Sequence, residues 1–96
     1  MGFYAERGTN QTVNPGVASA TISINPDSKS VRVHNSGANI CYVRIGDSVS
    51  GTPATSADMP VIAGEVILLR KGMGEGSLSH IAAAGTTLLV QTGEEY

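Results

Sequence analysis

The sequence predicts an all-β protein: a single compact antiparallel β-sandwich or small barrel, of jelly-roll or immunoglobulin-like type, with about seven strands. Short segments show period-two alternation of apolar and polar residues, and turn signals separate them at intervals of roughly 8 to 12 residues. Twelve Gly and four Pro among 96 residues weaken helix interiors and favour turns. With one Phe, three Tyr and no Trp, the core must be largely aliphatic.

The chain divides into two parts. Residues 1–16 are polar and turn-rich and predict an N-terminal arm or edge segment, whereas residues 17–96 form the β-sandwich domain. Phe3 and Tyr4 are the largest apolar side chains of the arm, so they either pack against their own domain or contact a partner. Since the arm has little core pattern, removing residues 1–15 is expected to weaken partner binding more than folding.

Alternation predicts two strands before residue 35. Residues 17–24 place an apolar side chain at every second position, and residues 31–34 alternate valine with arginine and histidine. This pattern is typical of strands that bury one face. Each segment is therefore expected to turn one face toward the core.

The next segment predicts a turn and a third strand. Residues 35–39 are small and polar, and Gly37 or Asn39 is expected to adopt a positive φ in a compact turn. In residues 40–45, every second side chain from Cys41 onward points to the core. Because a short turn joins them, we expect this strand to form an antiparallel hairpin with residues 31–34.

The second half of the chain predicts a long loop followed by further strands. Residues 46–58 lack a hydrophobic period, which indicates a surface loop of unusual length. A tight turn at Ala63-Gly64 leads into residues 65–70, whose nearly continuous apolar character predicts burial on both faces or at an interface. Residues 78–83 and 86–92 are expected to form a last hairpin.

The residues that could carry chemistry do not form a recognisable site. The candidate acid, base or metal-ligating side chains are Asp27, Asp47, Asp58, Glu65, Glu75, His34 and His80. No pair has metal-ligand spacing, and the nucleophile motif Gly-x-Ser-x-Gly does not occur. The sequence thus predicts a protein that is not an enzyme and that has no metal and no cofactor.

Two candidate groups have simpler structural interpretations. Asp47 and Asp58 bracket the long loop, where a shared calcium ion is possible in principle, but hydrogen bonding at the loop ends is favoured because Asp often accepts from nearby amides. Cys41, the single cysteine, lies within a strand pattern and is expected to be a small buried hydrophobe.

Charge and hydropathy argue against two classes of partner. Six basic residues are scattered among eight acidic ones, so no basic stripe favours nucleic-acid binding. No segment approaches the roughly 20 apolar residues that a bilayer span requires, and the N-terminus lacks a signal-peptide pattern. We therefore expect neither nucleic acid nor membrane as a direct partner, and synthesis and folding in the cytosol.

Most of residues 17–95 resembles small virion structural proteins of tailed bacteriophages. The motifs of the resemblance are the strand Val31-Arg32-Val33, the strand end Gly46-Asp47, the loop exit Met59-Pro60 and the final Thr92-Gly93-Glu94. These are strand and turn patterns without a chemical constraint. Residues 1–16 are not covered by the resemblance.

The resemblance implies a capsid decoration, or cement, protein that binds the capsid exterior and bridges capsomers. Its partners would be the major capsid protein or other virion proteins, and its location the virion, assembled in the host cytoplasm. By the same resemblance it would be a homo-oligomer, most readily a trimer on local three-fold axes. The residues expected at the partner interface are Phe3, Tyr4, Asp47, Asp58, Met59, Val66 and Leu68.

Three alternatives remain open. The first is a head-to-tail or tail accessory protein, which the same resemblance allows. The second is a carbohydrate-binding or receptor-binding β-sandwich, for which three tyrosines offer a thin aromatic platform. The third is a small enzyme of cupin-like shape, which would need a His and carboxylate cluster that the sequence lacks.

Overall fold

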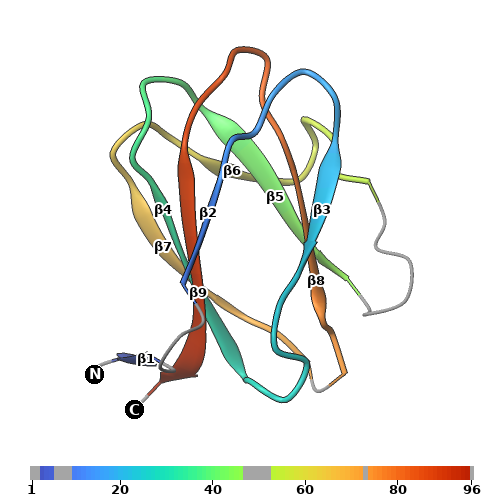
Figure 1. Cartoon of the computed structure of the whole chain (residues 1–96), viewed down its shortest axis with the longest axis vertical. Helices are drawn as coiled ribbons and strands as arrows, with labels where there is room; N and C mark the ends of the chain where they lie inside the picture. Colours follow the sequence, from blue (N-terminus) through green and yellow to red (C-terminus); the bar gives the residue numbers. More distant parts are fainter. Residues whose placement is uncertain (1–2, 6–9, 47–52, 73, 96) are drawn as a thin grey trace.

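The computed structural model describes residues 3–5, 10–46, 53–72 and 74–95, and this part of the chain is all-β (Figure 1). It contains nine strands in two antiparallel sheets. The described residues include no helix of the length and apolarity that a membrane span needs. The predicted fold class is confirmed.

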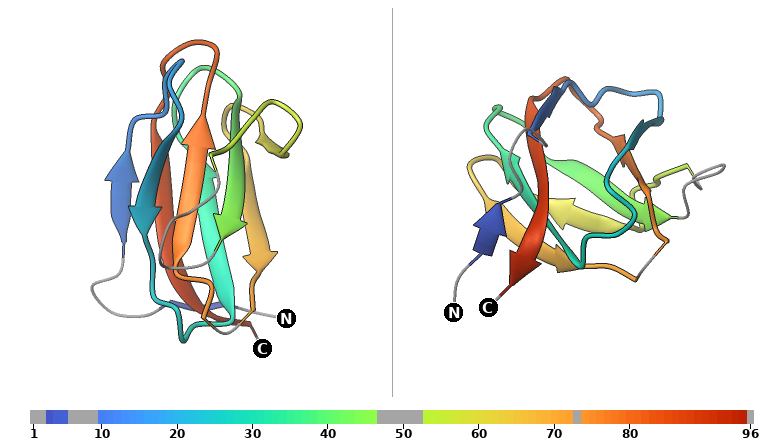
Figure 2. Two further views of the ribbon diagram at one scale, coloured as in Figure 1. Left: turned by 90° about the vertical axis from the view of Figure 1, so that its right-hand side faces the viewer. Right: turned by 60° about the horizontal axis from the view of Figure 1, so that its bottom comes forward.

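The two sheets face each other as a sandwich. Sheet A has the order β1-β9-β4-β7, with β2 also paired to β9, and its strands are β1 (Phe3–Ala5), β2 (Gln11–Val13), β4 (Ser30–Asn35), β7 (Val66–Arg70) and β9 (Leu88–Glu95). Sheet B has the order β3-β8-β5-β6, and its strands are β3 (Ala20–Ser23), β5 (Cys41–Gly46), β6 (Met59–Val61) and β8 (Ser77–Ile81). Figure 2 (left) shows β3, β8 and β5 side by side.

The chain changes sheet at most connections. From β2 to β9 it runs through sheets A, B, A, B, B, A, B and A, and only β5 and β6 follow each other within one sheet. With β1 set aside as an additional strand on β9, the orders β2-β9-β4-β7 and β3-β8-β5-β6 form the eight-stranded jelly-roll arrangement. In the immunoglobulin fold, by contrast, consecutive strands more often share a sheet.

Both hairpins expected from the sequence were wrong. β4 pairs with β7 and β9, whereas β5 pairs with β6 and β8, so residues 31–34 and 40–45 lie in different sheets. Likewise, β8 belongs to sheet B and β9 to sheet A. A short turn fits either a hairpin or a corner between layers, and each strand shows the same alternation in both cases.

The core is aliphatic and lies between the sheets. The buried apolar cluster contains Ile24, Val31, Val33, Cys41, Val43, Val61, Leu78, Ala82, Leu88 and Val90. Five further apolar residues, among them Ile67 and Leu69 of β7, pack against this cluster. The predicted inward direction of Cys41 and Val43 is confirmed, because both side chains are buried.

Part of the N-terminal segment is built into sheet A. β1 pairs with the end of β9 and β2 with its beginning. Val13 packs against the core, and Pro15 is fully buried, with its carbonyl accepting a hydrogen bond from Thr86 N at 3.3 Å. Removing residues 1–15 would therefore delete both β1 and β2 and part of the core packing.

A buried asparagine joins the loops at one end of the sandwich. Asn35 Nδ2 donates to the carbonyl oxygens of Asn39 and Val61, both at 2.8 Å. Asn35 Oδ1 accepts from Gly37 N at 3.1 Å and from Thr86 Oγ1 at 2.8 Å. One fully buried side chain thus ties β4 to three other segments, and its hydrogen bonds satisfy both ends of the amide.

The turn after β4 needs glycine for space. Neither Gly37 nor Asn39 has a positive φ, so that expectation was wrong. Instead, a Cβ atom on Gly37 would collide with Thr86 Oγ1 and approach Thr87 N to 2.5 Å. The close approach of the two loops is therefore what requires glycine here. The tight turn before β7 is as predicted, with Gly64 at φ 82°.

Candidate functional site

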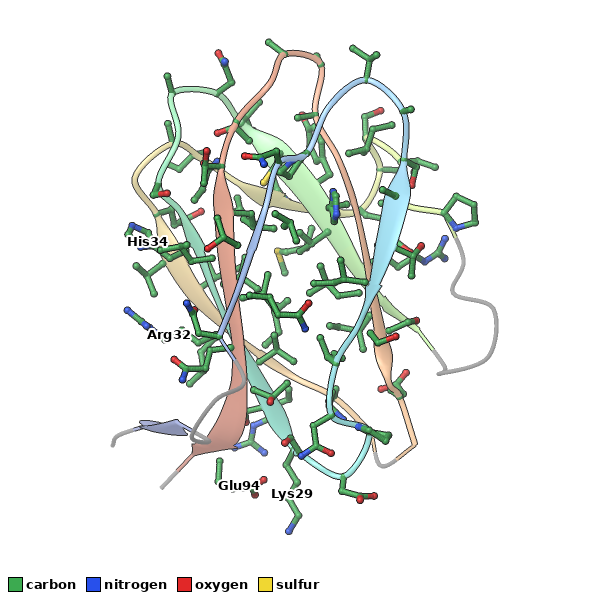
Figure 3. All side chains as sticks on the ribbon, in the orientation of Figure 1. Lys29, Arg32, His34 and Glu94 are labelled. Carbon is green, nitrogen blue, oxygen red and sulfur yellow. The ribbon has the colours of Figure 1, made fainter. Side chains whose placement is uncertain are left out.

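The outer face of sheet A carries exposed apolar side chains from β7. Val66 and Leu68 are 48% and 38% exposed, so the part of the chain that the structure describes does not bury both faces of β7. The register with β4 places His34 opposite Val66 and Arg32 opposite Leu68. Figure 3 shows Arg32 and His34 pointing away from sheet B. We call the surface formed by Arg32, His34, Val66 and Leu68 the β7 face.

β7 is also an edge strand. Just before β7, Asn35 N donates to Glu65 O at 2.9 Å. In the β4–β7 register, this hydrogen bond means that the odd-numbered residues of β7 direct their backbone N–H and C=O groups toward β4. Because these positions alternate in antiparallel pairs, the N–H and C=O groups of Val66 and Leu68 point away from β4. Within the described residues, no strand pairs with β7 on that side (Figure 1).

The segment leading into β6 folds onto the outer face of sheet B. Asp58 Oδ2 accepts a hydrogen bond from Thr55 N at 2.8 Å, and Asp58 Oδ1 lies 3.7 Å from Arg44 Nε. Ala54 N donates to Ser19 Oγ at 3.0 Å. Asp58 therefore closes its own loop by hydrogen bonding, as the simpler interpretation predicted. Asp47, its proposed calcium partner, lies outside the described residues.

A small pocket lies between this segment and sheet B. It has a volume of about 300 Å³ and is lined by Val17, Tyr42, Ala54, Thr55, Ser56, Ile81, Ala82 and Ala83. Tyr42 and Ile81 are opposite each other in the β5–β8 register. The lining is mainly apolar, with two hydroxyl-bearing residues from the loop. Sequence reasoning missed this pocket because its residues come from separate segments that show no common pattern.

The residues predicted at an interface fall into separate regions. Val66 and Leu68 lie together on β7, whereas Met59 begins β6, one of the two edge strands of sheet B, and Asp58 immediately precedes it. Met59 is 48% exposed.

The two aromatic residues of the arm lie elsewhere. The backbone of Phe3 and Tyr4 forms β1, opposite Glu95 and Glu94 of β9. Among the described residues, the predicted interface residues thus form three separate pairs, on β1, at β6 and on β7, and do not form one continuous surface.

The described residues contain no group of three or more His, Cys, Asp or Glu side chains placed to hold a metal ion. Cys41 is fully buried, and burial raises the pKa of its thiol to about 11. The expectation that Cys41 is a small buried hydrophobe is confirmed.

His80 is a buried histidine with an unsatisfied nitrogen. It shares the inner side of β8 with the core residues Leu78 and Ala82, since side chains alternate along a strand. Its Nδ1 has no hydrogen-bond partner among the residues that the structure describes. Burial lowers the pKa of His80 below its ordinary value of 6.5, because the charged imidazolium would be poorly solvated there.

This burial predicts loss of stability in acid. As pH falls below 6.5, the unfolded chain takes up the His80 proton before the folded chain does, so the free energy of unfolding decreases until the lower folded pKa is passed. Replacing His80→Leu is expected to flatten this part of the profile, whereas the matched variant His34→Gln is expected to retain it. Urea unfolding measured above and below pH 6.5 tests this. An unchanged slope in His80→Leu would contradict it.

Comparison with known proteins shows the fold alone. No family model and no curated protein matches the chain. A solved structure described as the crystal structure of PirA aligns with a TM-score of 0.57 over 91% of this chain and 95% of that chain, at 13% sequence identity.

Proposed function

We propose that this chain is a non-enzymatic structural protein of a bacteriophage virion that decorates the capsid exterior and bridges capsomers. The observation that supports an assembly role is the β7 face, where exposed Val66 and Leu68 lie on an edge strand. The virion assignment itself comes from the sequence resemblance. The proposed partner is the major capsid protein or another virion protein.

The fold suits such a role physically. The two sheets pack on a common aliphatic core, and a preorganised scaffold of this kind reduces the ordering entropy that docking costs. The β7 face combines apolar area with Arg32 and His34, a mixture common at protein interfaces. Since a capsid repeats its seams many times, weak individual contacts would act together and oppose the pressure of packaged DNA.

Analysis of purified virions tests this proposal. Particles would be purified from the phage whose genome encodes the chain, and examined by quantitative mass spectrometry and cryo-electron microscopy. Ordered density for the subunit across capsomer seams is the expected result. Density only at the neck or tail would favour the head-to-tail or tail accessory alternative, and absence from the particles would overturn a virion role.

The first strand provides a prediction for particle binding. Among the described strands, β1 pairs with β9 alone, at residues 93–95, and a deletion of residues 2–9 keeps β2 and the core residues in the chain. We expect this deletion to weaken binding to undecorated capsids roughly tenfold while preserving cooperative unfolding, because it removes Phe3 and Tyr4. Cosedimentation measures the effect. The double variant Phe3→Ser, Tyr4→Ser keeps the backbone of β1 and should weaken binding as the deletion does. If the deletion and the double variant both bind capsids with unchanged affinity, a contact between the arm and the capsid is refuted.

Carbohydrate binding is a second candidate, favoured by the pocket over sheet B. Its lining combines the Tyr42 ring with the hydroxyl-bearing Thr55 and Ser56, which together suit one face and the edge of a sugar ring. A glycan array with the unmodified chain and Tyr42→Ala tests it. Binding that Tyr42→Ala abolishes would establish this function, and an empty array would remove it.

A further inference from the structure

We infer that two copies of this chain pair through β7, forming an antiparallel β7–β7 seam that joins their A sheets about a twofold axis. The inference goes beyond the capsid role and does not depend on it. It rests on the exposed edge of β7, on the apolar residues of that strand, and on the way its register fits a second copy.

β7 is the least protected sheet edge of the described residues. Natural proteins usually guard edges with short strands, proline, or charged and polar residues. β6 has three residues and contains Pro60, β1 and β2 have three residues each, and β3 is rich in Ser and Thr. β7 has five residues, four of them Val, Ile or Leu. Its edge is therefore the one best suited to accept another strand.

The hydrogen-bonding pattern selects a particular self-pairing. When Leu68 lies opposite its own copy, Val66 lies opposite Arg70 and Ile67 opposite Leu69, so every residue of β7 gains a partner. Val66 and Leu68 direct their N–H and C=O groups to this side. The same register keeps outer-face residues on the outer face of both copies. Backbone pairing and side-chain orientation therefore agree.

Charge and apolar contact favour the same register. The two Arg70 residues lie at opposite ends of the seam, each across from Val66, whereas a seam centred on Arg70 would place like charges opposite each other. At the centre, the exposed side chains of Val66 and Leu68 from both copies form one continuous apolar strip. This strip explains why such an apolar strand is exposed in the single chain.

The symmetry differs from that expected by resemblance. A seam in which a surface meets its own copy is isologous and closes at two subunits, whereas a trimer requires two different surfaces. The mass in solution therefore discriminates between them. Virion analysis tests the capsid role independently, so either proposal can fail alone.

Sedimentation of the purified chain provides the first test. The unmodified chain is expected to show concentration-dependent dimers, and Leu68→Lys to raise the dimer Kd roughly 100-fold, because two ammonium groups would meet near the axis. The matched control is Ile40→Lys, which adds the same charge at a residue of similar exposure, 36%, just before β5. It should dimerise as the unmodified chain does.

Cysteine crosslinking locates the axis. Hydrogen-bonded residues that face each other in antiparallel strands have Cα atoms about 5.5 Å apart, within reach of a disulfide. Leu68→Cys should therefore form a covalent dimer under mild oxidation, whereas Ile40→Cys should not. Buried Cys41, with its raised thiol pKa of about 11, should not compete.

The outcomes separate clearly. Selective crosslinking of Leu68→Cys supports the seam even if Leu68→Lys fails to fold, since cysteine introduces no charge at this position. A chain that remains monomeric at every concentration, a trimeric mass, or a dimer unaffected by Leu68→Lys would overturn the inference.

Discussion

Replacing Asn35→Ala is expected to lower the free energy of unfolding by about 3 kcal/mol, since it leaves several buried groups without partners. The carbonyl of Val61 would lose its donor from the amide, and Gly37 N and Thr86 Oγ1 would lose their acceptor. The turn after β4, the end of β6 and the loop before β9 would lose their common link. A domain of this size has a total stability of roughly 5–15 kcal/mol, so the loss would be large.

A second asparagine provides the control for this prediction. Asn39 Nδ2 also donates to a backbone carbonyl, that of Gly85 at 2.9 Å, but this hydrogen bond is exposed to water. Asn39→Ala is therefore expected to cost less than about 1 kcal/mol. Urea unfolding of both variants gives the comparison. Equal losses in the two variants would contradict the central role of Asn35.

Gly37→Ala is expected to destabilise the chain by about 2 to 3 kcal/mol, because the added methyl group meets atoms that cannot easily move. Thr86 Oγ1 lies in its path and is held by a 2.8 Å hydrogen bond to Asn35 Oδ1. The backbone nitrogen of Thr87 would lie 2.5 Å from the new carbon. The two loops would have to separate, which would strain the hydrogen bonds of Asn35.

Glycine in the facing loop serves as the matched control. A Cβ on Gly85 meets nothing within 4 Å, and its φ is not in the left-handed region. Gly85→Ala is therefore expected to be neutral or to stabilise by up to about 1 kcal/mol. Adding Thr86→Ala to Gly37→Ala should recover only part of the loss, since the contact with Thr87 N remains. Thermal unfolding measures all three, and a wild-type melting temperature for Gly37→Ala would show that the loops yield freely.

Much of the secondary structure was readable from local pattern. Alternation identified which side chains of β5 face the core, and the Ala63-Gly64 pair identified the turn before β7. β1 and β2 were not predicted as strands, because three residues are too few to show a period. Their position on β9 depends on long-range pairing that no local signal describes.

The candidate site was predictable in part. Val66 and Leu68 were suggested by their apolar strand, and the structure places both on an exposed edge. The sequence does not show that Arg32 and His34 belong to the same surface. They lie opposite Leu68 and Val66 only because β4 pairs with β7, and this pairing is not visible in the sequence. The pocket around Tyr42 could not be predicted for the same reason, since its lining comes from four segments that are distant in sequence.

Composition and short-range alternation were sufficient to establish an all-β chain with an aliphatic core, because both reflect forces that act within a few residues: backbone preference and burial of one strand face. Which strands became neighbours was decided in three dimensions. A turn such as residues 36–40 can join a hairpin or form a corner between sheets equally well. Here the corner occurs together with buried hydrogen bonds from Asn35 to the end of β6 and to the loop before β9, 26 and 51 residues away. The strand order that results shows that β7 lies at an edge of sheet A, with no partner strand on its outer side among the described residues.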